Sequence, residues 1–126
     1  MTPEEKQLLL VDLCGRIPYG VKVQFECWDE QTEDYIEVVD TLYSVNSDEW
    51  VNVSETDSEI IIEGVKPYLF PKSSMTVEQR DSYRFLASSA YASPVGLINF
   101  YHKNHIDYRG LIPKGLAEDA TGLNIY

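Results

Sequence analysis

The stretch Val21-Lys22-Val23-Gln24-Phe25-Glu26-Cys27-Trp28 alternates apolar residues with mostly polar ones. A period of two is typical of a strand with one buried and one exposed face. We therefore expect a half-buried strand here, with Cys27 on the buried face. Three further apolar segments follow after short polar turns: residues 35–43, which alternate for most of their length, Trp50, Val51 and Val53, and the run Ile60-Ile61-Ile62. Short connections favour hairpins, so these four strands are expected to form an antiparallel meander.

Helix signals stand on both sides of this strand-rich middle. Thr2, Pro3 and Glu5 form a capping pattern that predicts a helix ending near Gly15 and Pro18. A second capping box over residues 76–79 predicts a helix to about Ser89, and residues 93–94 predict the start of a third. The apolar stripes of the three helices are expected to be Leu9, Leu10, Leu13, Cys14 and Ile17, then Val77, Tyr83, Leu86 and Ala90, then Leu97, Ile98, Tyr101 and His105.

Two segments fit neither pattern. In Lys66-Pro67-Tyr68-Leu69-Phe70-Pro71 the two prolines argue against a regular helix and a central strand, so we expect an extended crossing segment with buried aromatic side chains. Residues 107–126 hold three glycines and one proline, which predicts an irregular tail with a short helix near Leu116 and a mobile end.

A helix, a run of strands and two further helices place the chain in the α+β class, as a single domain over residues 1–126.

Acidic residues are concentrated in the middle of the chain. Thirteen Asp and Glu residues and no Lys or Arg lie between Val23 and Val65, whereas the other residues hold 8 acids and all 10 bases. The net charge of −11 therefore comes from this segment. Such a field repels nucleic-acid phosphates and attracts basic protein surfaces or cations, so we expect no direct nucleic-acid binding. A solvated sheet face without a partner is the simpler interpretation of the same charge.

Cysteine usage and hydropathy indicate a cytoplasmic protein. Cys14 and Cys27 make no disulfide framework, and both lie on predicted apolar faces, where we expect small core residues with inert thiols. The N-terminal stretch lacks the basic start of a signal peptide, and no apolar run is long enough to span a bilayer. We therefore expect no membrane interaction.

Two stretches carry a resemblance beyond these general patterns: Lys66-Pro67-Tyr68-Leu69-Phe70-Pro71-Lys72-Ser73-Ser74-Met75-Thr76 and His105-Ile106-Asp107-Tyr108-Arg109-Gly110-Leu111-Ile112-Pro113-Lys114-Gly115-Leu116-Ala117. With the opening residues 2–6 and the turn at residues 18–21, they resemble a group of small uncharacterised proteins of gut bacteria and of their phages and prophages. Phe70 stands where members of that group tend to carry Arg, and the acidic middle matches them poorly. The resemblance carries no activity over to this chain. It implies an accessory protein of a mobile element in a bacterial cytoplasm.

His102, His105 and Asp107 are the best metal candidates in the sequence. Two histidines three residues apart share one helix face, and a carboxylate follows closely. The set is short of the ligands of a zinc site, and the helical His-Glu-x-x-His spacing is absent. The competing interpretation is a partly buried His105 bonded to Asp107, with His102 exposed beside Lys103. On that interpretation the protein holds no metal, and we expect no other cofactor.

Asp107-Tyr108-Arg109-Gly110 is the densest polar cluster outside the strands. Arg109 could hold a carboxylate or a phosphate in a fork. An Asp and an Arg two residues apart more often brace a loop, and Gly110 permits the positive φ that a tight turn there requires. If the cluster is a binding site, its residues are expected to be His105, Asp107, Tyr108 and Arg109, together with Tyr68.

The sequence holds no familiar catalytic motif. It has no Gly-x-Ser-x-Gly elbow, no P-loop and no Rossmann glycine pattern. We therefore expect a non-catalytic protein–protein interaction protein, whose partner contacts either the acidic strands or the segments 68–76 and 107–113. Two alternatives stay open. One is a small metal-binding protein or enzyme built on His102, His105, Asp107 and Arg109. The other is an acidic DNA mimic that presents carboxylates in place of phosphates, with added contacts from Trp28, Tyr35, Tyr43 and Trp50.

Overall fold

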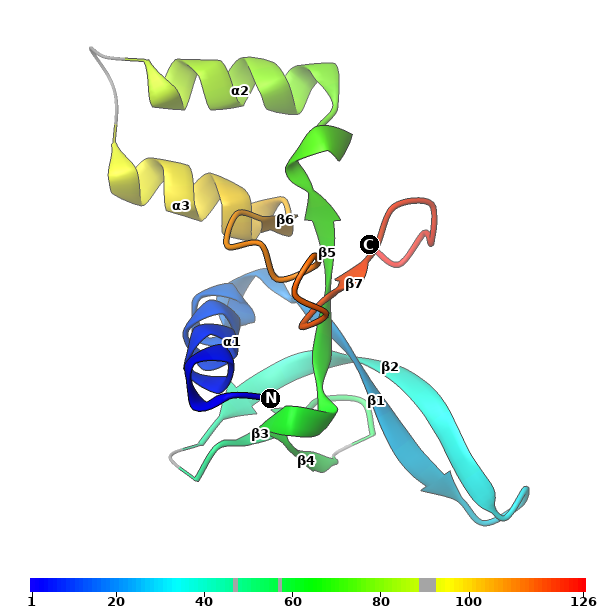
Figure 1. Ribbon diagram of the computed structural model, residues 1–126. Helices are drawn as coiled ribbons and strands as arrows, with labels where there is room; N and C mark the ends of the chain where they lie inside the picture. Colours follow the sequence, from blue (N-terminus) through cyan, green and yellow to red (C-terminus); the bar gives the residue numbers. More distant parts are fainter. Residues whose placement is uncertain (47, 57, 89–92) are drawn as a thin grey trace.

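The computed structural model describes residues 1–46, 48–56, 58–88 and 93–126. Within these residues the chain forms three α-helices and a seven-stranded sheet (Figure 1). The combination confirms the predicted α+β class. Short 3₁₀ turns join several elements: η1 (Ile17–Tyr19), η2 (Ile62–Gly64) and η3 (Lys72–Ser74).

Strand β1 (Lys22–Asp29) pairs antiparallel with β2 (Asp34–Val45), in a register that runs from Lys22 opposite Thr41 to Asp29 opposite Asp34. Strands β3 (Trp50–Val53) and β4 (Glu59–Ile61) follow, each antiparallel to the strand before it. The β2–β3 register shifts between Leu42 and Ser44. The sheet order is β4-β3-β2-β1-β5-β6, with β7 paired to β5, so the sheet contains more strands than the predicted four.

The proline-bracketed segment is strand β5 (Lys66–Pro71), and it lies inside the sheet rather than outside it. The expectation that two prolines exclude a central strand was therefore wrong. β5 changes partner along its length: it pairs with β1 at its start, with β7 (Glu118–Asp119) in its middle and with β6 (Ile106–Asp107) at its end. Each ladder is only two residues long, so neither proline has to donate to a continuous ladder. Burial of Tyr68 agrees with the prediction, whereas Phe70 is half-buried.

Helix α1 (Pro3–Arg16) begins at the predicted capping box, in which the Thr2 hydroxyl and the Glu5 carboxylate each accept the other's backbone N–H. Its buried face differs from the predicted stripe, because Asp12 and Arg16 are buried while Cys14 is exposed. The expectation of a core Cys14 was therefore wrong, and Cys27 is half-buried. The main core packs α1 against the sheet and the tail, with Leu9, Leu13, Val21, Val23, Phe25, Val51, Ile62, Leu69, Leu111 and Leu116 buried.

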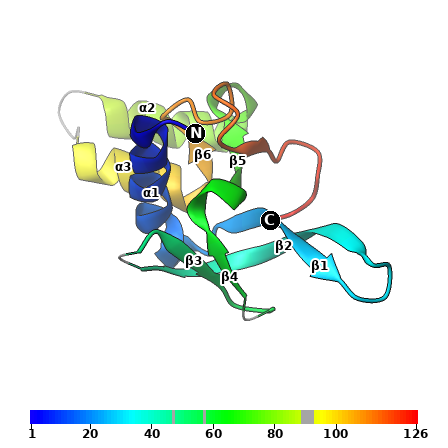
Figure 2. The ribbon, with the colours of Figure 1, turned by 60° about the horizontal axis from the view of Figure 1, so that its bottom comes forward.

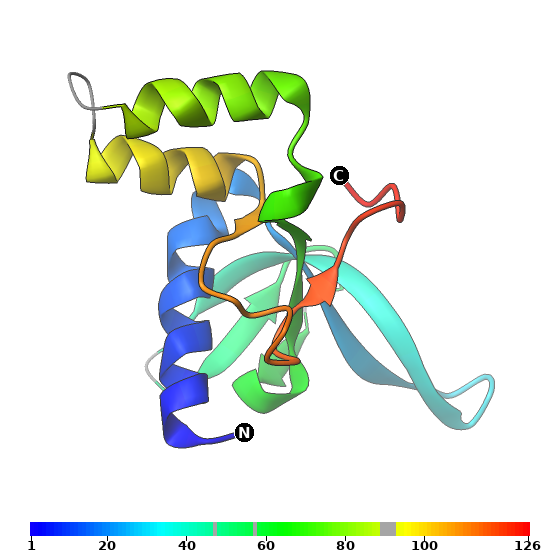
Figure 3. The same ribbon diagram turned by 45° about the horizontal axis from the view of Figure 1, so that its top comes forward.

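Helices α2 (Val77–Ala87) and α3 (Pro94–Lys103) form an antiparallel pair at one end of the molecule (Figure 3). Both begin at the predicted caps, Thr76 and Ser93. No described residue of α2 is buried, and Val77 is 76% exposed, so its predicted inner position was wrong. Ala90 lies outside the described residues. His105 does not extend the stripe of α3, because the helix ends at Lys103 and His105 has a φ of 57°.

The C-terminal segment is irregular, as predicted, but it is neither helical near Leu116 nor loose at its end. The Tyr126 hydroxyl accepts the backbone N–H of Lys22 (2.8 Å) and donates to the Tyr68 carbonyl (2.8 Å). Its ring stacks on His105 with centroids 3.7 Å apart. The hydroxyl thereby bridges β1 and β5 just beyond their two-residue ladder. Among the described residues, no helix has the length and apolar character needed to cross a membrane.

Candidate functional site

The β1–β2 hairpin extends beyond the rest of the sheet (Figures 1 and 2). Within the described residues, β1 pairs with β5 only at Val23 and Gln24, and β2 pairs with β3 only from Leu42 onward. The two strands nevertheless stay paired with each other to their ends at Asp29 and Asp34. We call residues 26–37 the hairpin arm. Both outer edges of this arm lack a strand partner among the described residues.

Two aromatic side chains lie opposite each other near the tip of the hairpin arm. Trp28 and Tyr35 are register partners, and their rings meet edge to face with centroids 5.2 Å apart. Such a cross-strand pair stabilises a hairpin by about 0.2–1 kcal/mol. Both residues nevertheless remain exposed, to 51% and 63%, and Ile36 on the opposite face is 42% exposed. The arm therefore presents apolar surface on both of its faces.

The hairpin arm carries six carboxylates and no Lys or Arg. Asp29 and Asp34 serve the turn, since they accept backbone N–H groups of Gln31 (3.1 Å) and Tyr35 (2.8 Å). Glu26 and Glu37 differ, because they are register partners and place two like charges side by side next to the Trp28–Tyr35 pair. Like charges directly opposite each other destabilise a sheet. Glu37 also interacts with the side chain of the buried Tyr68, which gives it a partner within the fold. The stability of the hairpin does not account for Glu26, whereas contact with a positive group would.

Other acids of the middle segment have structural roles or lie in separate turns. Asp40 is buried and accepts the backbone N–H groups of Thr41, Glu55 and Thr56 and the Thr56 hydroxyl. Burial raises the pKa of Asp40, but these hydrogen bonds outweigh it and leave the pKa below its usual value. Glu49 and Glu63 both bind the Lys6 ammonium, at 3.0 Å and 2.7 Å. The acidic segment is thus divided over several surfaces and one buried position.

Asp107 braces the loop that follows α3. Its carboxylate accepts the backbone N–H groups of Leu111 (3.0 Å), Ile112 (2.9 Å) and Arg109 (3.3 Å), and Asp107 is buried. The predicted loop brace is therefore present, but it is built from backbone donors. The Arg109 side chain turns to a different acid, Asp12 on α1.

Asp12 lies at the centre of a buried charged cluster, which the sequence prediction missed. Asp12 and Arg16 are 0% exposed, and the Arg16 Nε and Nη2 donate to the Asp12 carboxylate at 2.8 Å and 3.1 Å. Arg16 Nη2 also donates to the Ile106 carbonyl (2.7 Å), and Arg109 Nε donates to Asp12 at 3.2 Å. Two guanidinium groups thus share one carboxylate. The signal was present in the sequence, because Leu9, Asp12, Leu13 and Arg16 lie on one helical face.

The two histidines lie in different surroundings. His102 is buried, contrary to expectation, and its Nε2 is 2.8 Å from the Tyr108 hydroxyl. Burial, together with the nearby Arg16, lowers the pKa of His102. His105 stacks on Tyr126, and its predicted bond to Asp107 is not among the hydrogen bonds of the described residues. Burial and Arg16 lower the pKa of His105 to about 4.

The described residues contain no group of three or more His, Cys, Asp or Glu side chains that could hold a metal ion. The helical spacing that suggested such a site fails because the chain leaves α3 before His105. Within the described ranges, His102, His105 and Asp107 therefore do not form a group that could hold a metal ion.

Tyr68 lies apart from the other predicted site residues. Tyr108 joins the buried cluster, because its hydroxyl accepts Arg109 Nη2 at 2.9 Å and its ring lies under the Arg109 guanidinium. Tyr68 is instead buried beside the arm, where burial and the Glu37 and Glu118 carboxylates raise its pKa. The structure thus joins His102, Tyr108 and Arg109 and leaves Tyr68 with the acidic hairpin.

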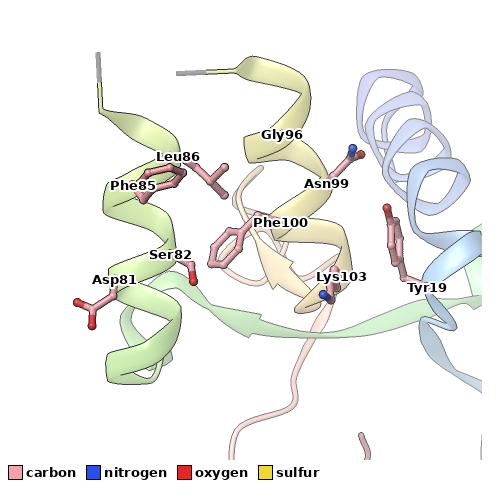
Figure 4. Close-up of a pocket in the computed structure, with 9 residues that line it drawn as sticks. All are labelled: Tyr19, Asp81, Ser82, Phe85, Leu86, Gly96, Asn99, Phe100 and Lys103. Carbon is pink, nitrogen blue, oxygen red and sulfur yellow. The ribbon is translucent and has the colours of Figure 1, made fainter. Parts of the chain in front are cut away.

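A shallow hollow of about 600 Å³ lies along α2 and α3 (Figure 4). Phe100 points from α3 toward α2, where Leu86 and Phe85 form the other wall, and Tyr19 lies on the far side of α3. Asp81 points away from α3. The polar groups do not converge on one point, so the hollow lacks the feature that fixes a ligand's orientation in a specific site.

No protein-family model matches the chain, and searches of curated proteins and of solved structures found no match. Function is therefore inferred from the geometry and chemistry of the surfaces described above.

Proposed function

We propose that this protein is a non-catalytic interaction protein that binds a basic surface of a partner protein through its hairpin arm. The observation that carries the proposal is the Glu26–Glu37 pair beside the exposed rings of Trp28 and Tyr35. Exposed aromatic side chains are the usual anchors of protein interfaces. Carboxylates around them steer a basic partner and disfavour an acidic one.

The chemistry elsewhere in the molecule favours this function over catalysis. Arg109 and Tyr108 are engaged with Asp12 and with each other, and Asp107 is fully used by backbone donors. These groups hold α1, the loop after α3 and the sheet together. The acids are divided among the arm, other turns and the buried Asp40, which favours a local interaction surface over a continuous imitation of DNA.

We infer the biological setting from the resemblance of residues 66–76 and 105–117 to small proteins of gut bacteria and their phages. In that setting the protein is a phage or mobile-element accessory protein that acts in the bacterial cytoplasm on a host or phage protein. A basic partner fits this setting, because nucleic-acid-binding proteins present positively charged surfaces.

A pull-down from bacterial lysate tests the proposal. The immobilised protein should capture a basic protein at low salt and release it at about 0.5 M salt, where charges are screened beyond a few ångströms. The double variant Trp28→Ala/Tyr35→Ala should lose most of that capture. Tyr43→Ala is the matched control, because Tyr43 is 69% exposed but lies outside the arm.

Two results would contradict the proposal. One is capture of the same partner by wild type and by the arm variant to equal extent. The other is a partner that resists high salt and is lost only in the Tyr43→Ala control. Circular dichroism of each variant checks that the hairpin remains folded.

A further inference from the structure

A groove of about 450 Å³ lies between β1 and β4, on the side of the arm that faces the body of the protein. Its walls come from several strands and from the turn η2. Gln24, Phe25 and Glu26 belong to β1, Ile60 and Ile61 to β4, and the rest of the wall includes Tyr35, Glu63, Lys66 and Glu118. β1 and β4 are separated in this way because the sheet curves without closing (Figure 2).

The β1 side of this groove is an unpaired strand edge. In an antiparallel ladder the backbone groups of alternate residues point to alternate sides. Leu42 N–H donates to the Val21 carbonyl, so the odd-numbered residues of β1 face β2, and the even-numbered ones face outward. Lys22 uses its outward N–H on the Tyr126 hydroxyl, and Gln24 pairs with Lys66. The outward groups of Glu26 and Trp28 have no strand partner among the described residues.

The loss of pairing at Glu26 has a structural cause. Continuing the β1–β5 register would set Glu26 opposite Gly64, but Gly64 belongs to the 3₁₀ turn η2, which leads the chain away. The β4 edge is also free, because β4 pairs only with β3 among the described strands. Ile62 N–H donates to the Glu49 carbonyl, so by the same alternation Glu59 and Ile61 point their backbone groups away from β3. Both edges can therefore accept an added strand.

Charge selects the kind of strand that fits. Three carboxylates and one ammonium line the groove. Glu63 binds the Lys6 ammonium at 2.7 Å, and Glu118 lies 3.7 Å from the Lys66 ammonium. Glu26 differs, because its cross-strand neighbour is Glu37 rather than a base. A second copy of this chain would bring the same acids against Glu26, and like charges oppose edge-to-edge pairing. Phe25, Ile60 and Ile61 supply apolar wall. The Gln24 Oε1 atom is buried in the wall without a hydrogen-bond partner among the described residues.

We propose that this groove receives an extended segment of the partner protein, with alternating apolar and basic residues, as an added strand on the free edge of β1. The proposal rests on the function proposed above and specifies how the partner is bound. Main-chain hydrogen bonds to Glu26 and Trp28 hold the segment, and its Lys or Arg side chains contact Glu26. The free edge from Glu26 to Asp29 is about 13 Å long and accommodates about four residues of the added strand.

The test uses the full chain, isotope-labelled, and synthetic peptides of about ten residues. A peptide of alternating Val and Lys should bind and slow hydrogen exchange of the Glu26 and Trp28 amides at least about tenfold. A peptide of alternating Val and Glu should not bind. The same Val-Lys peptide with all of its backbone nitrogens methylated should also fail, because neither of its edges can then donate a hydrogen bond to β1. Glu26→Lys should weaken binding by about fivefold or more, whereas Glu30→Lys, with the same net charge but in the turn, should change it less than about twofold.

Three outcomes overturn strand addition. They are equal binding of the N-methylated peptide, protection located away from β1, and no binding of the Val-Lys peptide. Each of these leaves the proposed function intact if the lysate partner is still lost with Trp28→Ala/Tyr35→Ala. Failure of that pull-down, by contrast, removes the proposed function itself. The two failures are therefore distinguishable.

Discussion

Removing the Asp12 carboxylate is the most severe single perturbation that the buried cluster offers. Asp12→Ala deletes the acceptor of three charge-assisted hydrogen bonds, two from Arg16 and one from Arg109. Arg16 is 0% exposed, so its guanidinium would remain buried without a counter-ion. Breaking a buried pair in this way destabilises proteins by about 3–5 kcal/mol. Alanine itself suits the interior of α1, so the helix is not the source of the loss.

The expected loss is a large part of the total stability, which is about 5–15 kcal/mol for a domain. With 126 residues and an unfolding entropy of about 2.1 cal/mol/K per residue, a loss of about 4 kcal/mol lowers the melting temperature by about 15 °C. Urea unfolding followed by far-ultraviolet circular dichroism measures the free energy of unfolding directly. Asp81→Ala is the matched control, because Asp81 is an exposed acid on a helix, and it should change that free energy by less than about 0.5 kcal/mol.

A double variant separates charge burial from lost packing. Asp12→Leu with Arg16→Met replaces both buried charges by apolar side chains, so it should be less destabilised than Asp12→Ala alone. Some loss should remain, since the Ile106 carbonyl loses its donor from Arg16. A loss below about 1 kcal/mol for Asp12→Ala would refute the reasoning. So would a double variant as unstable as the sum of its single variants.

Three further predictions concern stability. The unfolded chain binds a proton at His105 below the ordinary pKa of 6.5, whereas the native chain binds it only below about 4. The free energy of unfolding should therefore rise by about 1–3 kcal/mol from pH 4 to pH 6.5. His105→Asn should flatten that rise in urea titrations at several pH values. Asp40→Ala should lower the free energy of unfolding by about 2–4 kcal/mol, because two backbone N–H groups of the β3–β4 turn lose their acceptor. A loss below about 1 kcal/mol would show that water replaces the carboxylate as acceptor. Tyr126→Phe should lower the unfolding free energy by about 1–3 kcal/mol, since Lys22 N–H and the Tyr68 carbonyl both lose a partner; an unchanged melting temperature would contradict the bridge.

The local signals of the sequence predicted most of the secondary structure. The capping boxes at Thr2 and Thr76 and the cap at Ser93 all occur, because they depend on side chains within three residues of each other. The apolar patterns of residues 21–28, 35–43 and 50–53 mark strands β1 to β3, and the run Ile60-Ile61-Ile62 marks β4, although Ile62 belongs to η2. The placement of β5 could not be predicted in this way. Its partners β6 and β7 are two-residue strands from a segment without periodicity, and only the tertiary fold brings them to Leu69 and Phe70.

The functional surfaces were less accessible to sequence reasoning. Alternation placed Glu26 and Trp28 on one face of their strand, and the register then set Glu37 and Tyr35 opposite them. The sequence does not reveal that the hairpin extends past its neighbours, because this depends on where β3 and β5 stop pairing. Arg109 was predicted as a polar anchor, but its partner Asp12 is distant in sequence and required the fold.

Photo-crosslinking from the hairpin arm tests the central claim most directly. A photo-reactive phenylalanine analogue replaces Tyr35 in one variant and Val77 in another, since both positions are exposed but only Tyr35 lies in the arm. We predict that the Tyr35 variant forms a covalent adduct with a basic protein in bacterial lysate, that the adduct is lost at about 0.5 M salt, and that the Val77 variant forms none. An adduct from the Val77 position, with none from Tyr35, would contradict the claim that the arm is the binding surface.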